Sequence, residues 1–510
     1  MHSELNPLGR PASAQTVAII VPSARRARAW IPVLAGALRD RLGVAAHLVT
    51  AGGVERPHTM TAPERLERLM VNSYGDFGRM IDVTTVALAS LSPRPALIVD
   101  VAGQLDSTAA ADVPVLNPVL NGRGLEASIV SALWSRQPLQ LGVTLTTGQG
   151  SKMLHAALIA IPDRQMTTRA LDAIFRRLVA LLVESVAHLL YGRPLPSLPA
   201  GIAQRPAPLS GGDMWKQALH GYLPKAGRQF AKRFIRRNDW CIGYRRRTEP
   251  ARFPENLDLS PKTFLLLSSP PSRYYADPFL FEQDGATFLF FEDYDYTTGR
   301  AHISYVMLGP NGPSEPAVAL VRPYHLSYPF IFAYEGRILM VPETCGNRSI
   351  ELYEATVFPG AWRLRSVLVP NIDAADVTLH RRHGRWWMFA TVVEHGSSSW
   401  DTVSVLWADA LEGPWHPHPM NPVKYDVAAS RPAGALIEAD GRLLRPTQDC
   451  SNGYGSALTW CEVMELTETG FAERLIARQA CTPGSSYYGL HTYNRTASFE
   501  TVDFKRSRRR

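Results

Sequence analysis

The sequence predicts an α/β domain followed by an all-β domain of the β-propeller class. In the first part of the chain, short apolar runs alternate with stretches of helical spacing, which is the pattern of a three-layer α/β domain. From residue 274 onward, one hairpin pattern returns at intervals of about 50 residues, which is typical of propeller blades. With 510 residues, of which 45% are hydrophobic and 20% charged, the chain can bury a core in each domain.

The charge and the cysteines exclude several classes of protein. Much of the net charge of +8 comes from residues 232–247 and 505–510, so nucleic-acid binding by the whole surface is not expected. The five cysteines include no CxxC pair, which argues against a disulfide framework or a zinc site. No apolar run follows a basic start, and none reaches the ~18 residues of a membrane helix. We expect a cytoplasmic protein without an export signal, a cofactor or a metal.

The α/β domain is expected to span residues 14–191. Its predicted strands lie at 16–22, 45–50, 96–103, 113–119, 139–147 and 153–161, and its predicted helices at 24–42, 62–80, 125–135 and 166–190. This alternation favours a largely parallel sheet. The loop after the first strand reads PSARRARAW and contains no GxGxxG, so no dinucleotide site is predicted there.

Residues 192–238 are expected to connect the two domains. The part up to residue 212 is rich in Pro, Gly, Ser and Ala, as linkers are. Residues 213–237 are basic and partly amphipathic, with an interruption at Pro224. This stretch is either a peripheral contact with an anionic membrane, which would place the protein at the inner membrane surface, or a connecting helix with a solvated basic face.

The predicted propeller spans residues 239–506. Strand, tight turn and strand recur at 274–293, 327–344, 375–392 and 430–449, and a weaker fifth opening starts at Leu490. In the first three units, eight residues separate the opening residue (277, 328, 376) from the turn glycine (285, 336, 384). Five units predict five blades, and residues 239–247 are expected to close the ring.

The opening residues of the units are the candidate site. In five-bladed propellers of the furanosidase type, the innermost strands begin at the axis, so these side chains are expected to line one funnel. Carboxylates can act as acid, base or hydroxyl ligand, and aromatic faces stack on sugar rings, so a sugar site is predicted. The candidate catalytic residues are Asp277, Asp376 and Glu343, and the candidate binding residues are Tyr328, Arg431, His491, Glu292, Asp449 and His325.

The propeller segment resembles a known family. The motifs YADPF, HLSYPF, DVTL, SRPAG, QDCSNGYG and HTYN resemble the N-terminal domain of plant glucosamine inositolphosphorylceramide transferases and, more distantly, the family 43 glycoside hydrolase superfamily. The resemblance implies a five-bladed propeller in which Asp277 matches the hydrolase base. In the plant relatives, glycosyl transfer is attributed to a separate C-terminal domain, so the family name does not itself imply that activity.

Two positions depart from the hydrolase pattern. Where the hydrolases carry a second Asp after Pro, this chain has Pro329-Phe330, and where they carry Glu-Gly-Pro it has Ser430-Arg431-Pro432. Arginine donates no proton at neutral pH, but it can bind a phosphate or a carboxylate. The ligand is therefore predicted to be a sugar, and an anionic or phosphorylated sugar is one form it could take. If the site is catalytic, Asp376 or Glu343 is predicted to replace the missing acid.

The run from Leu116 to Leu145 resembles the core of the formyltransferase family. Asn117 falls on the family's catalytic Asn, Arg123-Gly124 on its Arg-Gly, and residues 142–144 on its Gly-Val-Thr. The family's His position holds Val119, and a valine transfers no proton. We expect a formyltransferase-like domain that has lost formyl transfer.

Three hypotheses about function remain open from the sequence. The first is a carbohydrate-active protein of polysaccharide or glycolipid biosynthesis, in which the propeller binds a sugar, hydrolyses a glycoside or transfers a glycosyl group. The second is a formyl- or acyltransferase acting on an amino sugar. The third is a propeller scaffold for other proteins. The oligomeric state is not predicted.

Overall fold

The computed structural model divides into two units, and each is described by itself. One comprises Met1–Pro224 with Glu394–Ser398, and the other comprises Lys225–Val393 with Ser399–Arg510. The structure describes residues 15–51, 64, 67, 76–105, 112–134, 138–164, 166–199, 236–247, 252–394, 396–482 and 485–509. The basic stretch up to residue 235 therefore lies outside the described residues. None of the described helices combines the length and apolar character needed to span a bilayer.

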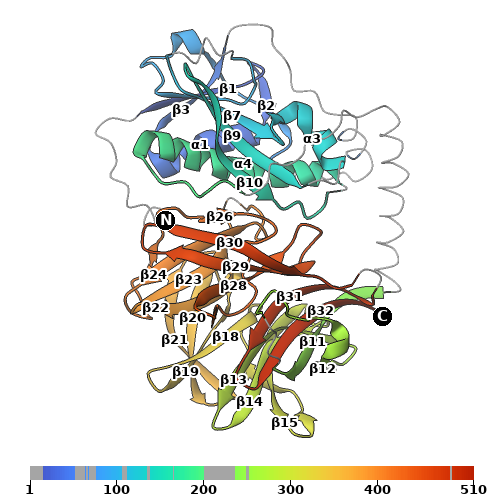
Figure 1. Ribbon diagram of the computed structural model, residues 1–510. Helices are drawn as coiled ribbons and strands as arrows, with labels where there is room; N and C mark the ends of the chain where they lie inside the picture. Colours follow the sequence, from blue (N-terminus) through green and yellow to red (C-terminus); the bar gives the residue numbers. More distant parts are fainter. Residues whose placement is uncertain are drawn as a thin grey trace. The chain divides into compact units, whose positions relative to one another are not determined.

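The N-terminal unit contains a mixed eight-stranded sheet (Figure 1). Its order is β10-β9-β7-β6-β1-β3-β5, with β8 beside β7. The strands are β1 (Thr16–Ile20), β3 (Ala45–Thr50), β5 (Val86–Ala87), β6 (Leu97–Asp100), β7 (Val115–Leu120), β8 (Arg123–Gly124), β9 (Leu139–Thr147) and β10 (Gly150–Ile159). Pairing is parallel from β7 to β5 and antiparallel at β7–β9 and β9–β10. The predicted parallel arrangement thus holds for one side only, because a hairpin such as β9–β10 must be antiparallel.

The α-helices whose bounds lie within the described residues of this unit are α1 (Trp30–Leu42), α3 (Leu125–Trp134) and α4 (Thr167–Tyr191), and both α1 and α3 contact α4. The helix predicted from residue 24 begins only at Trp30. Residues 26–28 form a short strand, β2 (Arg26–Arg28), which pairs with β4 (Met80–Asp82), so tertiary pairing overrides the helical spacing. Most of the helix predicted at 62–80 lies outside the described residues.

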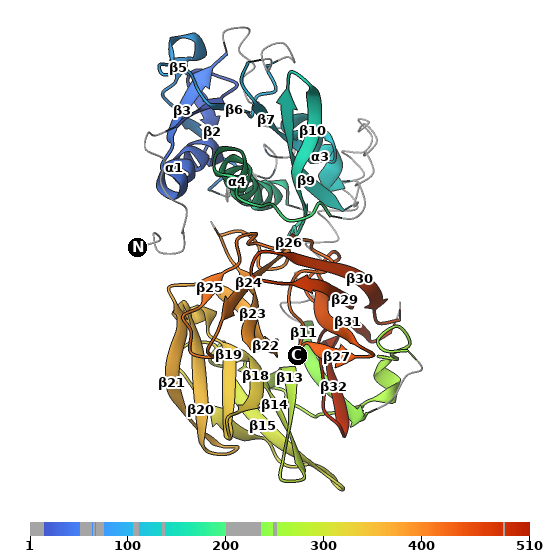
Figure 2. The ribbon, with the colours of Figure 1, turned by 60° about the vertical axis from the view of Figure 1, so that its left-hand side comes forward.

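The second unit consists of five sheets around a common axis (Figure 2), which confirms the predicted five-bladed propeller. Blade 1 consists of β13 (Arg273–Gln283), β14 (Ala286–Asp295), β15 (Arg300–Gly309), β16 (Gly312–Pro313) and β17 (Ala317–Leu320). Blade 2 consists of β18 (Ser327–Tyr334), β19 (Arg337–Glu343), β20 (Ser349–Val357) and β21 (Ala361–Pro370). Blade 3 consists of β22 (Ala374–Arg382), β23 (Arg385–Val392), β24 (Thr402–Ala408), β25 (His416–Pro417) and β26 (Lys424–Tyr425). Blade 4 is β27 (Ile437–Ala439), β28 (Arg442–Asp449), β29 (Ala457–Leu466) and β30 (Phe471–Gln479).

Blade 5 closes the ring by joining the two ends of the unit. Its order is β12-β11-β32-β31, with β11 (Arg236–Arg246), β12 (Leu265–Leu266), β31 (Tyr487–Arg495) and β32 (Phe499–Arg509). β11 pairs with β32 along its whole length, so the segment predicted to close the ring does so. Apolar side chains then fill the space between neighbouring blades; Ile242 of blade 5, for example, shares a cluster with Tyr275 and Phe291 of blade 1.

The predicted hairpin turns are present. At Asp284-Gly285, Glu335-Gly336, His383-Gly384 and Asp440-Gly441, both residues have positive φ, as a type I′ turn requires. The fourth hairpin is shorter than predicted, because β27 begins only at Ile437. Before it, one isolated bridge joins Pro432 to Thr447. Pro432 has no N–H to donate, which limits ladder formation in this segment.

The opening residues of blades 1 to 3 share an unusual backbone conformation. Asp277, Tyr328 and Asp376 have φ values of 49, 44 and 54°, and each lies where the strand register shifts. In each case, a carboxylate of the preceding blade accepts the backbone N–H: Asp503 at 3.0 Å, Asp277 at 3.3 Å and Glu343 at 3.1 Å, respectively. A left-handed non-glycine residue costs about 1–3 kcal/mol. The ring of blades therefore holds these residues in conformations that they would not adopt alone.

Gly434 is expected to be intolerant of substitution. It has φ +133°, and an added Cβ would lie 2.0 Å from the Tyr493 backbone oxygen. Gly434→Ala is expected to lower the free energy of unfolding by about 1–3 kcal/mol because the backbone must shift. Gly285→Ala is the control, since its Cβ would meet open space and only the cost of positive φ remains. Urea unfolding of both variants tests this, and equal losses would contradict it.

Candidate functional site

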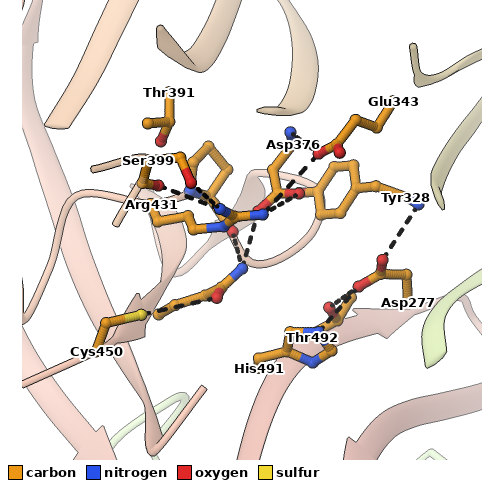
Figure 3. Close-up of polar contacts among 12 residues, drawn as sticks. Asp277, Tyr328, Glu343, Asp376, Thr391, Ser399, Arg431, Cys450, His491 and Thr492 are labelled. Atoms are coloured by element: carbon orange, nitrogen blue, oxygen red, sulfur yellow. Dashed lines mark hydrogen bonds and ion pairs between the residues drawn. The ribbon is translucent and has the colours of Figure 1, made fainter. Parts of the chain in front are cut away.

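The polar side chains at the propeller axis form two groups with Tyr328 between them (Figure 3). They come from the openings of the inner strands and from the ends of their partner strands. Their side chains are almost fully buried, with 2% to 11% relative exposure for Asp376, His491, Asp277, Arg431 and Glu343. Burial of this many ionisable groups is costly unless they are paired, so their pairing decides what the site can do.

The first group is built around Arg431, in the segment before β27. Its Nε donates to Asp376 Oδ2 at 2.6 Å and its Nη2 to Asp376 Oδ1 at 3.2 Å, which makes a bidentate ion pair. Nη1 donates to the backbone oxygen and the Oγ of Ser399 at 3.2 and 2.9 Å. Gln448 Nε2 donates to Asp376 Oδ2 at 2.9 Å, and Glu343 Oε2 lies 3.9 Å from Arg431 Nη2. The guanidinium of Arg431 therefore donates hydrogen bonds to protein groups from Nε, Nη1 and Nη2.

Burial and ion pairing set the charges in this group. Burial raises the pKa of Asp376 to about 7, with Arg431 acting against the rise and Glu343 adding to it. Burial acts to lower the pKa of Arg431, but Asp376, Tyr454 and Glu343 together outweigh this effect and raise the pKa well above its usual value. Arg431 therefore stays a cation, and the ion pair depends on whether Asp376 is ionised.

The second group is built around Asp277, at the start of blade 1. Its Oδ1 accepts a hydrogen bond from Thr492 Oγ1 at 2.9 Å and lies 3.4 Å from His491 Nε2. On the other face of the imidazole, His491 Nδ1 lies 2.7 Å from Asp503 Oδ2. Asp503 also accepts the backbone N–H groups of His491 and Thr492 at 3.1 and 3.0 Å. This carboxylate is therefore fixed, and it orients the histidine toward Asp277.

Burial raises the pKa of Asp277, although the charge of His491 acts against this rise. Burial acts to lower the pKa of His491, but Asp503 and Asp277 outweigh it and the pKa is raised. An imidazolium placed between two carboxylates can hold a proton or pass it to a bound hydroxyl group. The second group is thus the part of the site with acid–base capacity.

Aromatic residues that the sequence did not single out individually join the two groups. The His491 ring stacks on Trp240 at 3.8 Å with an interplanar angle of 14°. Tyr454 stands edge-on to His491 at 5.2 Å and lies 5.0 Å from the Arg431 guanidinium, so it touches both groups. Trp400 lies 5.7 Å from Tyr454. Trp240 occurs in DWCIGYRRR, the segment expected to close the ring, and Tyr454 occurs in QDCSNGYG, one of the motifs that resemble the known family.

A buried ion network holds the backbone next to Arg431. Arg445, on β28, donates from Nη1 to the Ser430 backbone oxygen at 2.8 Å and from Nη2 to the Ala429 oxygen at 2.9 Å. Glu473 pairs with Arg445 at 2.7 Å and with Lys424 at 2.8 Å. The network fixes the backbone that carries Arg431. Sequence reasoning missed it because Glu473 lies on an outer part of blade 4, far from any opening motif.

The other predicted site residues differ in where they lie and in which groups they contact. Glu292 and His325 lie 3.4 Å apart in blade 1 and its connection to blade 2. Tyr328 presents no free face to a sugar, because the side chain is fully buried and its hydroxyl contacts Thr378 Oγ1 at 2.8 Å and the Gly434 N–H at 2.7 Å. Asp449 belongs to a separate contact, since Arg478 Nε donates to it at 2.7 Å.

The donor atoms of Asp277, His491 and Asp503 lie within 4.8 Å of one another, which raises the question of a metal. The surroundings of Asp503 fit a metal ligand poorly. Its oxygens accept three backbone N–H groups and face the ring nitrogen of His491. An orienting carboxylate in this position needs no cation.

The segments predicted to resemble the formyltransferase core lie on neighbouring strands of the N-terminal unit. Asn117 of β7 pairs with Thr144 of β9, and Val119 pairs with Gly124 of β8. Thr146 Oγ1 donates to Asn117 Oδ1 at 3.2 Å. The three matched segments are therefore adjacent, yet the position that would hold the base is a valine without a titratable group.

The similarity of this chain to a known protein family lies in the propeller. Residues 264–492 match the family model described as "Glucosamine inositolphosphorylceramide transferase 1, N-terminal". The chain is similar to glucosamine inositolphosphorylceramide transferase 1 of rice (Oryza sativa), with 36% identity over 208 residues, or 40% of this chain and 28% of the relative. The Arabidopsis thaliana protein of the same name is 31% identical over 211 residues, or 40% of this chain and 27% of the relative. The chain thus aligns with less than a third of either relative's length.

Solved structures show a weaker likeness. A family 117 glycoside hydrolase of Zobellia galactanivorans, Zg3597, has 13% identity and a TM-score of 0.34, covering 52% of this chain and 90% of its own. A mutant of the family 43 protein BlXynB of Bacillus licheniformis has 15% identity and a TM-score of 0.31, covering 42% of this chain and 48% of its own. These likenesses carry no information about the reaction. The match to the family model and to both plant proteins shows that residues 264–492 of the propeller are similar to the N-terminal domain of glucosamine inositolphosphorylceramide transferase 1.

Proposed function

We propose that the propeller binds a sugar at its axis and that the protein acts in glycolipid or polysaccharide assembly. The observation that carries the proposal is the convergence at the propeller axis of buried carboxylates, a histidine and aromatic rings, of which Tyr454 and Trp400 are partly exposed and Trp240 is buried. Such groups accept and donate hydrogen bonds to sugar hydroxyls and stack on sugar rings. The name of the plant relatives, which contains glucosamine, agrees with a sugar ligand.

The charge balance favours a neutral sugar or an amino sugar over a phosphorylated one. Five carboxyl groups (Asp277, Asp376, Glu343, Glu292, Asp503) face four basic side chains (Arg431, His491, His325 and Lys505, whose Nζ lies 5.2 Å from the Trp240 ring), so acidic groups outnumber basic groups by one. The guanidinium that the sequence offered to an anion already donates to Asp376 and Ser399. An added phosphate would meet like charge, whereas an ammonium group would be attracted.

The arrangement supports recognition better than glycoside hydrolysis. An inverting hydrolase needs two carboxyl groups free to act as acid and base. Asp376 is held by Arg431 and by Gln448, and Arg431 occupies the place of the hydrolase acid. The second group, Asp277 with His491, retains acid–base capacity, so transfer to a bound hydroxyl group is the reaction to test once a ligand is known.

The test is a binding screen with the full chain. Saturation-transfer NMR and calorimetry would compare glucose, glucosamine, N-acetylglucosamine and the 6-phosphates of glucose and glucosamine. We expect the uncharged and amino sugars to bind, and each phosphate to bind at least about tenfold more weakly than its parent, because the like-charge contact costs about 1.4 kcal/mol or more.

Two outcomes of the screen would contradict the proposal. Tighter binding of the phosphates would show that the site selects anions despite its acidic excess. Failure of every sugar to bind would leave a scaffold role as the better account.

A further inference from the structure

Beside the axial groups, four aromatic rings of blade 1 and its connection to blade 2 form a compact cluster, which we call the aromatic corner of blade 1. It consists of Tyr274, Tyr294, Tyr296 and His325. Tyr274 and Tyr294 stack at 4.7 Å with an interplanar angle of 12°, and Tyr296 stands edge-on to both. All four side chains are only partly buried. Partly exposed, polar-edged aromatic faces next to an acidic site are the usual surfaces for sugar rings.

Glu292 connects this corner with Asp277. It pairs across the hairpin with Ala276, the residue before Asp277, and its charge contributes to the raised pKa of Asp277. Its Oε1 accepts a hydrogen bond from the Tyr274 hydroxyl at 3.2 Å and lies 3.4 Å from His325 Nε2. The backbone N–H of Ala301 donates to His325 Nδ1 at 3.2 Å, so the ring presents its Nε2–H to the carboxylate.

The other oxygen of Glu292 is the informative atom. The Glu292 side chain is 8% exposed, yet among the described residues no hydrogen bond reaches its Oε2. Oε2 is not one of the fully buried side-chain atoms that lack a partner in the described part of the chain, so it keeps contact with solvent and is accessible to a ligand. Since Tyr274 and His325 fix the orientation of the group, Oε2 is a ready acceptor for a ligand hydroxyl or ammonium group.

The distance from Asp277 indicates what kind of ligand reaches the corner. Tyr274 precedes Asp277 by three residues on β13, which at ~3.3 Å per residue is about 10 Å along the strand. A single sugar ring held at Asp277 does not extend that far. A ligand that touches both places contains at least two linked rings.

We propose that the aromatic corner of blade 1 and Glu292 form a second sugar subsite, which holds the ring next to the one bound at Asp277. The inference rests on the proposed sugar-binding function and specifies its ligand as an oligosaccharide or a glycan headgroup of at least two rings. The flat faces of Tyr294 and Tyr296 pack on the second ring, and Glu292 Oε2 accepts one of its hydroxyl or ammonium protons.

The test compares glucosamine with its β-1,4-linked dimer by calorimetry on the full chain. In the unaltered protein, the dimer is expected to bind about three- to tenfold more tightly than the monomer, a gain typical of one added ring–aromatic contact. Tyr294→Leu, which keeps apolar bulk and removes the flat face, should abolish this advantage and leave monomer binding unchanged. Tyr294→Phe should retain the advantage, which guards against a variant that is merely misfolded.

Trp407→Leu is the matched control, because Trp407 packs against His416 in blade 3 at 4.6 Å, apart from the axial groups. It should leave both affinities unchanged. Equal binding of monomer and dimer by the unaltered protein, or a dimer advantage that survives in Tyr294→Leu, would overturn the subsite while the sugar-binding function stands. Absence of binding by both sugars would overturn the function as well.

Discussion

Glu473→Gln is expected to lower the free energy of unfolding by about 3–5 kcal/mol, because it leaves a buried cation without its counter-charge. Arg445 and Glu473 are 1% and 2% exposed, and Lys424, their third partner, is 20% exposed. The glutamine keeps the shape of the side chain but cannot neutralise either base. Urea unfolding followed by near-UV circular dichroism measures the loss. Because Arg445 also holds the backbone of residues 429 and 430, next to Arg431, sugar binding at the propeller axis should weaken in the same variant.

The pH dependence of stability gives an independent check. Burial acts to raise the pKa of Glu473, but Arg445 and Lys424 outweigh it and lower the pKa to about 2, from 4.5. A carboxyl group with a lowered native pKa stabilises the fold above its unfolded pKa, and this contribution disappears as the pH falls from about 4.5 toward 2. The shift corresponds to about 3 kcal/mol. Glu473→Gln should therefore flatten the stability profile between those pH values.

The control for this prediction is Glu412→Gln. Glu412 pairs with Arg365 at 2.6 Å, but its side chain is 46% exposed. An exposed ion pair contributes at most about 1 kcal/mol, so this variant should unfold almost like the unaltered protein. Similar losses in both variants would show that burial of the Arg445 pair does not matter.

Asp277→Asn is expected to weaken sugar binding by about 10- to 100-fold with little change in stability, because a hydrogen bond to a charged group is stronger than one to an amide. The asparagine keeps an acceptor for the Tyr328 N–H but loses the charge that faces His491 and the ligand. Asp503 still pairs with His491 in this variant, so the imidazole keeps a counter-charge and the fold loses little. Calorimetric titration with glucosamine, or with the sugar that binds best in the screen, measures the effect.

Asp277→Ala separates binding from folding. It removes the acceptor of both the Tyr328 N–H and the Thr492 hydroxyl, so unfolding should become easier by about 1–3 kcal/mol in addition to the loss of binding. Asp284→Asn is the matched control, because Asp284 also has positive φ, 51°, but lies at the exposed turn of the same hairpin. Undiminished sugar affinity in Asp277→Asn would remove Asp277 from the site.

Which features could be predicted from the sequence depends on how far apart in the chain the interacting residues lie. The hairpins were predictable because a type I′ turn needs only neighbouring residues, such as Asp284-Gly285. The opening residues at 277, 328 and 376 could be found from their constant spacing to the turn glycines. The start of α1 was mispredicted, since the pairing of β2 with β4 joins residues more than 50 positions apart.

By itself, the sequence determined the five-bladed propeller, the resemblance of its motifs to a known family and the candidate residues at its axis, because repeats and motifs involve residues close together in the chain. Only the tertiary structure decided their partners. Arg431 meets Asp376 across 55 residues, and Thr492 meets Asp277 across 215. From the sequence, Arg431 was expected to be able to bind a phosphate. In the tertiary structure it is instead one half of a buried ion pair with Asp376. The physical reason is that the strength and sign of a buried charge's effect depend on which groups lie within a few ångströms of it, and that is set by closure of the ring.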